Sequence, residues 1–339
     1  MERKLEPLDN DDASATTSVR LISLDSPHLV TSQIRQRRFS HSLRAMIDGT
    51  KAGELRPAPA TADNLPTTAT LPGPPPEWDA LAHGDGSIAV VWTVAGSAVS
   101  HLSYKNRKNA TALTVNSGTP FAVFVAPHFV GGTQRDSIVA VALLPQSEPM
   151  VVVFRQKDDG AFEKYKPIEV SWRGIPADAR LVQISDGYVL FAKVIPPGGQ
   201  IQNAPARRLF GSEMVQPGWL EVLRLDADLK PARGAVPHFD EGAVFEFDAV
   251  SVSGRIALLT TTPTGSTLGL WDEQGRPIVE ADRSQSGSPQ RRSELHFASA
   301  GLLTSPSLLF AMKQLYVAAI RDAGPVARVV TTKIDLSSL

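Results

Sequence analysis

Seven histidines and a set of acidic residues are the side chains of this sequence that could carry acid–base chemistry. The histidines are scattered and lack the His-x-His or His-x-x-x-His spacing that is typical of metal sites, so no metal site is predicted. The tripeptide Pro127-His128-Phe129 recurs as Pro237-His238-Phe239, and Leu295-His296-Phe297 resembles both. Histidines at equivalent strand ends could converge on one point, although a half-buried histidine at the end of a strand is the simpler interpretation.

Most glycoside hydrolases use two carboxylates, one on either side of the glycosidic bond, as catalytic residues. Acidic residues fall at several expected strand ends: Asp79, Asp136, Asp240, Glu241, Glu246 and Asp248. Composition alone supplies such a set, and turn caps or solvated positions explain most of its members. A catalytic pair is therefore an alternative hypothesis, which requires that two carboxylates meet roughly 5–10 Å apart.

The sequence excludes or disfavours several other kinds of site. The chain has no cysteine, which excludes disulfides and thiolate nucleophiles. The glycine pairs Gly131-Gly132 and Gly198-Gly199 do not join a strand to a helix, so no phosphate-binding loop and no cofactor are predicted. Asp226 and Asp228 lack the ligand spacing of a calcium loop and are interpreted as turn residues. No catalytic residue is predicted.

Two clusters of arginines are the strongest candidates for a binding site. They are Arg35, Arg37 and Arg38 beside Phe39, and Arg207 with Arg208. Arginine beside apolar side chains is typical of protein–protein interfaces, whereas a solvated basic stretch is the plainer alternative. The chain carries 34 basic and 35 acidic residues, a formal charge of −1, so neither nucleic acid nor an anionic membrane is an expected partner. A protein partner is predicted, and membership of a larger complex is one form of it.

The elements that must position these residues are β-strands. From Glu77 onward, short runs of Val, Ile, Leu and aromatic residues alternate with Gly, Pro, Asp and Asn. One unit recurs at intervals of roughly 50–70 residues, close to the blade repeat of propellers, and consists of a small or acidic turn followed by a buried strand. Its copies are Asp85–Trp92, Asp136–Ala142, Asp186–Ala192, Ser253–Leu259 and Lys313–Ala319.

A second strand that runs into a polar turn follows three of these copies, at Phe154–Gly160, Leu223–Pro231 and Leu270–Pro277. The unit thus has the form of a four-stranded propeller blade. We therefore predict an all-β fold, a five-bladed β-propeller over residues 77–339, with a β-sandwich as the alternative. Alternating residues of the repeated strand should be buried between blades: Ile88, Val90, Val139, Val141, Val189, Phe191, Ile256 and Leu258.

Residues 1–76 are rich in Ser, Thr, Pro and charge, and they are predicted to form an extended or partly disordered N-terminal arm. The last repeat ends at Leu336 without a fourth strand. Because an open sheet edge favours aggregation, we expect Val19–Leu24 of the arm to complete that sheet. The insertions at 196–217 and 280–295 are expected to be excursions from the repeat and not extra blades.

These observations favour a non-enzymatic binding or scaffold module, which presents loops to a protein or glycan partner while the arm docks in a larger assembly. The alternative is a carbohydrate-active hydrolase with a carboxylate pair on the propeller axis, so whether the chain is an enzyme stays open. The uncharged stretch 109–134 contains prolines and polar residues, and no membrane span is predicted. The compartment is unknown. A soluble, cytoplasmic protein is expected unless an N-terminal leader has been removed.

Overall fold

The strands of this protein form where runs of β-branched and aromatic residues are bounded by glycine, aspartate and proline. In a computed structural model the described backbone comprises residues 2–4, 6–7, 16–35, 38–48, 55–57, 68–70, 78–82, 88–94, 98–103, 111–114, 128–130, 139–144, 150–156, 162–164, 168–169, 171–198, 207–208, 214–233, 238–280, 291–292, 294–298, 303–322 and 327–335. Side chains are described for 18–32, 43–46, 78–82, 88, 153, 171–198, 216–233, 242–278, 295–297, 303–321 and 329–335. None of the described residues forms a helix of the length and apolarity that crossing a bilayer requires.

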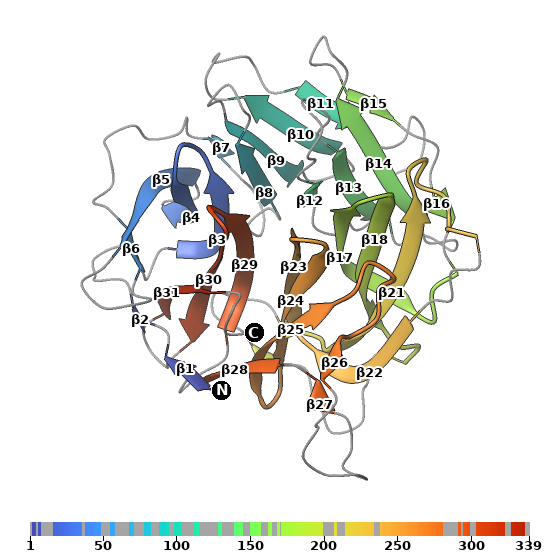
Figure 1. Cartoon of the computed structure of the whole chain (residues 1–339). Coiled ribbons are helices and arrows are strands. Elements are labelled where there is room, and N and C mark those ends of the chain that lie inside the picture. Colours follow the sequence, from blue (N-terminus) through green and yellow to red (C-terminus); the bar gives the residue numbers. More distant parts are fainter. Residues whose placement is uncertain are drawn as a thin grey trace.

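Six sheets of four or five strands are arranged as the blades of a ring in the described part of the chain (Figure 1). The first strand of each blade lies next to the axis. These innermost strands are β3 (Thr16–Ser23), β8 (Trp78–Ala82), β12 (His128–Val130), β17 (Ile175–Ile184), β23 (Glu246–Val252) and β29 (Leu303–Ala311). Each contacts the next in that order, and β29 contacts β3, so the ring is closed.

The outer strands complete each blade. Blade 1 adds β4 (Pro27–Arg35), β5 (Arg38–Asp48), β6 (Leu55–Pro57) and β7 (Thr68–Thr70). Blade 2 adds β9 (Ile88–Val94), β10 (Ala98–Ser103) and β11 (Thr111–Thr114), and blade 3 adds β13 (Val139–Leu144), β14 (Met150–Gln156), β15 (Phe162–Lys164) and β16 (Ile168–Glu169). Blade 4 adds β18 (Gly187–Ile195), β21 (Gly218–Asp226) and β22 (His238–Val244). Blade 5 adds β24 (Arg255–Thr262), β25 (Gly265–Trp271), β28 (Glu294–Ala298) and β1 (Glu2–Lys4), and blade 6 adds β30 (Gln314–Asp322), β31 (Ala327–Ile334) and β2 (Glu6–Pro7).

The predicted fold class, an all-β propeller, is confirmed, and the closed ring excludes the sandwich alternative. The described ring has six blades and not five, because residues that were predicted to belong to the arm form blade 1. Val19, Leu21 and Leu29 of this blade pack against Tyr316 and Ile320 of blade 6. The apolar face of blade 1 is therefore covered by a segment far away in the sequence, which the local pattern could not indicate.

The repeated strands are buried as predicted wherever their side chains are described: Ile88, Val189, Phe191, Ile256 and Leu258. The side chains of Val90, Val139 and Val141 lie outside the described set. In the core between blades 4 and 5, the rings of Phe191 and Trp271 meet edge to face with centroids 5.5 Å apart.

The two insertions contribute short two-stranded ribbons and no blade within the described residues. The first ribbon pairs β19 (Arg207–Arg208) with β20 (Met214–Val215), and the second pairs β26 (Val279–Glu280) with β27 (Arg291–Arg292).

The N-terminus closes the last blade, but with a different segment from the one predicted. Val19–Leu24 belongs to the innermost strand of blade 1, and the edge of β31 pairs instead with β2, where Glu6 lies opposite Thr331 and Pro7 opposite Val330. The preceding strand, β1, adds in parallel to β28 of blade 5. The first seven residues thus join two neighbouring blades, which protects both edges from further pairing.

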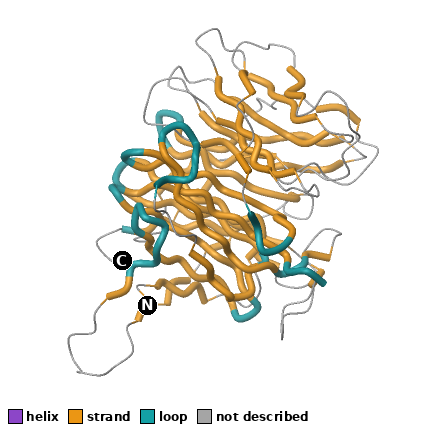
Figure 2. The backbone as a smooth tube through the Cα atoms, turned by 90° about the vertical axis from the view of Figure 1, so that its right-hand side faces the viewer, coloured by secondary structure: helices purple, strands orange, loops and turns teal. Residues whose placement is uncertain are grey.

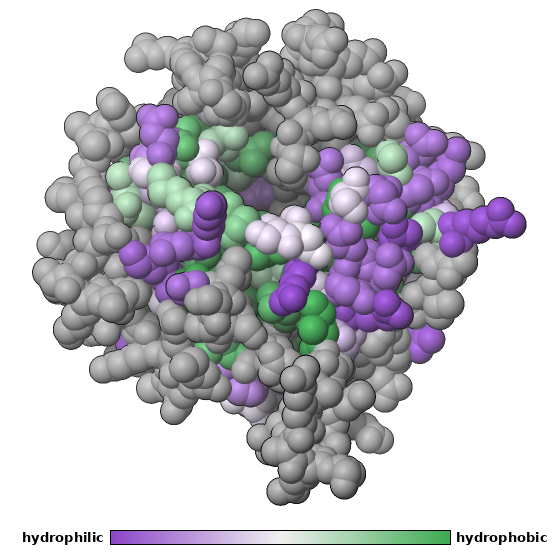
Figure 3. Space-filling model, viewed as in Figure 1, coloured by the Kyte–Doolittle hydropathy of each residue, from purple (hydrophilic) through white to green (hydrophobic). Residues whose placement is uncertain are grey.

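The ring has two distinct faces, because its innermost strands run in one direction. Val19 is hydrogen-bonded to Ser305 and Leu21 to Ser307, so β3 and β29 are parallel. The turn face is the one where innermost strands end, and it carries tight turns such as 253–254, 272–276 and 312–313. Most described turns gather on one side of the ring in Figure 2, and the turn face is mainly hydrophilic over blade 4 in Figure 3. The loop face is the opposite one, where the innermost strands begin.

The aspartates interpreted as turn residues do shape turns. Asp226 Oδ1 accepts the backbone N–H groups of Asp228 and Lys230, and Asp272 Oδ1 accepts those of Gln274 and Arg276, all at 2.9 Å. Blades 4 and 5 therefore use one turn design, and its carboxylates are occupied by backbone donors.

Two truncations should distinguish the contribution of the closing strands β1 and β2 to stability from the contribution of blade 1. Removing residues 1–7 should lower the melting temperature by only a few degrees, because the short β1 and β2 ladders contribute about 1 kcal/mol per hydrogen bond. Removing residues 1–30 should abolish cooperative unfolding, since it deletes β3 and the buried side chains Val19, Leu21 and Leu29. Differential scanning calorimetry measures both. An unchanged melting temperature without residues 1–30 would contradict the place of blade 1 in the ring.

Candidate functional site

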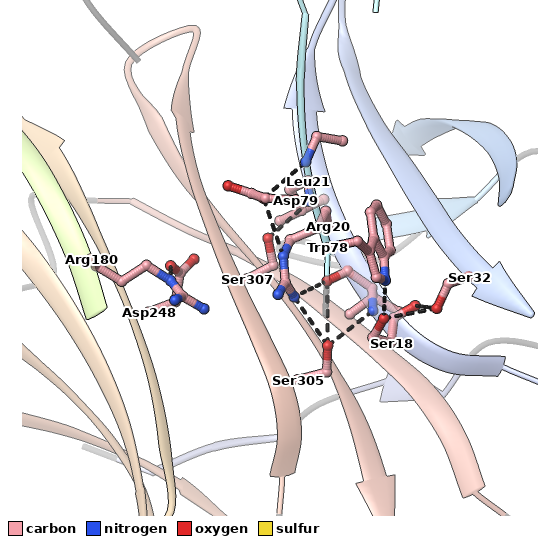
Figure 4. Close-up of polar contacts among 12 residues, drawn as sticks. Ser18, Arg20, Leu21, Ser32, Trp78, Asp79, Arg180, Asp248, Ser305 and Ser307 are labelled. Atoms are coloured by element: carbon pink, nitrogen blue, oxygen red, sulfur yellow. Dashed lines mark hydrogen bonds and ion pairs between the residues drawn. The ribbon is translucent and has the colours of Figure 1, made fainter. Parts of the chain in front are cut away.

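Arg180, on the innermost strand of blade 4, pairs with Asp248 on the innermost strand of blade 5 (Figure 4). Its Nε donates to Asp248 Oδ1 at 2.9 Å, and its Nη1 donates to Asp178 Oδ1 at 2.7 Å. The guanidinium lies over the ring of Phe247, 5.6 Å from the centroid. Burial alone would lower the pKa of Arg180, but the carboxylates of Asp178, Asp248 and Asp79 raise this pKa overall, so the side chain stays charged.

Arg20 repeats this arrangement across the ring. It lies on the innermost strand of blade 1, and its Nε is 3.2 Å from Asp79 Oδ1 on the innermost strand of blade 2. Its guanidinium lies over the ring of Trp78, again 5.6 Å from the centroid. In both places an arginine on one innermost strand meets an aromatic residue followed by aspartate on the next. The two pairs are three blades apart and hence opposite each other in the ring.

Backbone N–H groups along the axis are satisfied by side chains of neighbouring blades. Ser305 Oγ accepts the N–H of Val19 at 3.0 Å and Ser307 Oγ accepts the N–H of Leu21 at 2.8 Å, which joins blades 6 and 1. The register of β29 shifts between Thr304 and Ser307, and Ser305 has a φ of +48°. This bulge directs both hydroxyls of β29 toward blade 1 (Figure 4).

The same device joins blades 5 and 6. Leu308 N donates to Asp248 Oδ2 at 2.6 Å, and Ser305 N donates to the carboxylate of Glu246. The contacts therefore form one polar network that runs through blades 4, 5, 6, 1 and 2. It provides acceptors for backbone N–H groups on the axial edges of innermost strands, which have no strand partner on that side.

The candidate catalytic carboxylates are engaged in this network. Both oxygens of Asp248 are used, one by Arg180 and the other by Leu308 N, while Asp79 Oδ1 contacts Arg20 and accepts the N–H of Ala80. Each acid is thus neutralised by a guanidinium and holds strands together. Such groups are poorly suited to donate or accept a proton from a substrate. The side chains of the other candidates, Asp136, Asp240 and Glu241, lie outside the described set.

The three histidines of the repeated tripeptide do not occupy equivalent positions. His128 lies on β12, an innermost strand, whereas His238 lies on β22, the outermost strand of blade 4, and His296 lies on β28, which is the fourth strand of blade 5 and pairs with β1 on its outer side. The hypothesis that they converge on one point is therefore wrong. Within the described residues no three His, Asp or Glu side chains are grouped so that they could hold a metal ion.

Sequence reasoning missed both axial arginines and the serines of β29. One signal could have found part of the network, because Trp78-Asp79 and Phe247-Asp248 repeat an aromatic–aspartate pair. The partners also share a local pattern, because Arg20-Leu21-Ile22 and Arg180-Leu181-Val182 each consist of arginine, leucine and a β-branched residue.

The predicted partner-binding residues lie at or between the second and third strands of two blades. Arg35 ends β4 and pairs with Arg38, which begins β5, while Phe39 lies opposite Ile34. Arg207 and Arg208 form β19, in the connection between β18 and β21. Arg37 lies outside the described residues, and the side chains of the other five are not described. The arginine-bearing connections thus occupy the same position in blades 1 and 4.

Both connections leave the ring at the loop face. Ser185, which directly follows β17, donates hydrogen bonds from its N–H and its hydroxyl to the carboxylate of Glu273. Glu273 lies in the turn after β25, and this turn is on the same face of the ring as the end of β23. The innermost strands of blades 4 and 5 therefore run parallel. Since β18 and β4 run back toward the start of their innermost neighbours, Ile195 and Arg35 end on the same face. The two arginine-bearing connections therefore begin on one face and on opposite blades.

Comparisons with known proteins identify a fold and no family. No family model matches the chain, and no curated protein matches it. A solved sialidase of Trypanosoma rangeli in complex with sialic acid aligns with 98% of this chain and 57% of its own, at 10% identity and a TM-score of 0.53.

Two other solved structures align less well. The catalytic domain of a GH62 alpha-L-arabinofuranosidase of Coprinopsis cinerea aligns at 12% identity, 98% and 95% coverage and a TM-score of 0.45. BBS1N in complex with ARL6DN aligns at 14% identity, 97% and 96% coverage and a TM-score of 0.47. At 10% identity the sialidase alignment supports the fold alone, and the two alignments with a TM-score below 0.5 carry no argument.

Breaking an axial pair should destabilise the ring strongly. Arg180→Met should lower the free energy of unfolding by about 3–5 kcal/mol, because it leaves the buried Asp248 and the half-buried Asp178 without their cation. The matched control is Arg276→Met, which breaks an exposed pair with Asp272 and should cost less than about 1 kcal/mol. Urea denaturation measures both, and equal losses would contradict a special role for the axial pair.

Proposed function

We propose that this protein is a non-enzymatic binding module that docks a protein partner on its loop face. The observation that carries the proposal is the common position of the two arginine clusters. Arg35 and Arg38 flank the β4–β5 connection, Arg207 and Arg208 lie in the β18–β21 connection, and both connections leave opposite blades at the same face. A partner that covers this face can meet both clusters at once.

The physical chemistry of the face agrees with this proposal. A propeller is a rigid ring, so connections on its face are held at fixed separations without the entropic cost of ordering a flexible scaffold. Arginine presents a planar fork of donors that fits carboxylates, and it is enriched among the residues that dominate interface energies. We expect the partner to present carboxylates to these arginines.

The hydrolase alternative is less well supported. It requires a carboxylate that is available to act as an acid and another that is available as a base or nucleophile. The axial acids Asp79 and Asp248 are instead paired with arginines and hydrogen-bonded to backbone N–H groups. The shared propeller fold does not by itself argue for hydrolysis, because this fold hosts unrelated functions.

The proposal is tested by replacing the four arginines, Arg35, Arg38, Arg207 and Arg208, with alanine in the full, affinity-tagged chain. A protein partner should co-purify with the unchanged chain and be lost from the variant, because arginines at an interface often dominate its binding energy. An unchanged melting temperature of the variant excludes unfolding as the cause of the loss. Quantitative mass spectrometry of the purified material and a thermal melt give the two readouts.

A variant of the turn face serves as the control. Asp228, Lys230 and Arg255 are exposed there, and their replacement by alanine should leave partner binding unchanged. Loss of the partner from this variant, with retention by the loop-face variant, would overturn the proposal. Hydrolysis of aryl glycosides by the unchanged chain, abolished by Asp79→Asn, would favour the hydrolase.

A further inference from the structure

Glu221, on β21, is a buried carboxylate without a cation beside it. The residue is only 6% exposed, and among the described residues no lysine or arginine forms an ion pair with it. Its Oε1 accepts the backbone N–H of Arg173 at 3.1 Å and the indole N–H of Trp219 at 3.0 Å. Its Oε2 accepts no hydrogen bond from the described residues and is not one of the fully enclosed atoms without a partner, so solvent reaches it. A buried charge without a counterion is costly, so a cation that reaches Oε2 would be held there.

The carboxylate lies near the loop face, between blades 3 and 4. Side chains alternate along β21, so Glu221 points to the same side of the sheet as Leu223, which packs in one core cluster with Val153 of blade 3. The strand begins at Gly218, where the β18–β21 connection rejoins the sheet at the loop face. A partner on the loop face can therefore reach this carboxylate.

Two half-buried tryptophans accompany the carboxylate. Trp219 donates to it directly, and Trp172 precedes Arg173, whose N–H is bonded to the same oxygen. Both indole rings pack against the core cluster between blades 3 and 4, so they lie on the same side of the sheet. The indole N–H of Trp172 is buried without an acceptor in the described structure, so apolar contacts hold this ring. We call Trp172, Trp219 and Glu221 the indole site.

We propose that the indole site binds a lysine side chain of the protein partner. The ammonium group would donate to Oε2 of Glu221 and neutralise the carboxylate, while the methylene stem covers the half-buried rings of Trp172 and Trp219. An ammonium group beside indole rings is also attracted by their π-electrons.

The carboxylate favours lysine over arginine. The planar fork of arginine pairs best with both oxygens of a carboxylate, but Oε1 of Glu221 already accepts two N–H groups. A single point charge on a slim stem needs only the remaining oxygen. This inference rests on the proposed docking at the loop face and names one side chain of the partner.

The probe is the peptide Gly-Ser-Lys-Ser-Gly, blocked at both ends and titrated against the full, ¹⁵N-labelled chain. The indole N–H signals of the five tryptophans are followed by NMR, and Trp172→Phe and Trp219→Phe assign the two signals of the site. Both signals should shift with the lysine peptide. A peptide with norleucine in place of lysine keeps the stem but lacks the charge and should not bind, and a peptide with arginine should bind more weakly.

Glu221→Gln should weaken binding of the lysine peptide about tenfold or more, the effect typical of losing a hydrogen bond between charged groups. The amide oxygen can still accept both N–H groups, so the fold should be retained. The matched control is Glu273→Gln, because Glu273 accepts the N–H and the hydroxyl of Ser185 on the turn face, and it should leave binding unchanged. If Glu221→Gln does not fold, Trp172→Leu takes its place, because it removes a ring of the site but no hydrogen bond.

An absence of shifts with the lysine peptide, equal binding of the norleucine or arginine peptide, or equal weakening by the two Glu→Gln variants would overturn the inference. If Glu221→Gln keeps the natural partner while the four-arginine variant loses it, the indole site is not used by the partner and the docking function stands. If the lysine peptide binds as expected but the four-arginine variant keeps the partner, the arginine docking is wrong and the indole site stands.

Discussion

The contacts between neighbouring innermost strands are the constraint on which the rest of this propeller depends. An innermost strand pairs with its own blade on one side only, so its other edge presents backbone N–H groups toward the axis. In this protein Ser305, Ser307, Glu246 and Asp248 accept those donors from the next blade. The ion pairs Arg20–Asp79 and Arg180–Asp248 also join neighbouring innermost strands. Blade spacing and strand register around the axis follow from these contacts.

This use of charge has a functional consequence. In a propeller the axis is where side chains from several blades meet, and a pair of available carboxylates there could act in catalysis. Here the described axial acids neutralise buried guanidiniums, whose desolvation would otherwise be costly. Acids held in this way stabilise the ring, and our proposal therefore places recognition on a face, where connections differ from blade to blade.

The two faces differ in structure, and this difference agrees with our proposal that the partner binds only at the loop face. The turn face carries tight turns whose aspartates are occupied by backbone donors, as at Asp226 and Asp272. The arginine-bearing connections of blades 1 and 4 leave the ring at the loop face. A rigid ring with one variable face is well suited to hold a partner across its diameter.

The sequence by itself determined the local features of this protein. Alternating apolar residues at Val189, Phe191, Ile256 and Leu258 indicated half-buried strands, and the Asp-rich turns followed from backbone chemistry, so the all-β propeller class could be read directly. Tertiary structure alone decided the sixth blade, whose apolar residues are buried by blade 6, and the closing strand, where Glu6–Pro7 takes the edge of β31. It also decided the roles of Asp79 and Asp248. What a carboxylate does depends on the groups that lie near it in the folded protein, and here Arg20 and Arg180 pair with these two aspartates.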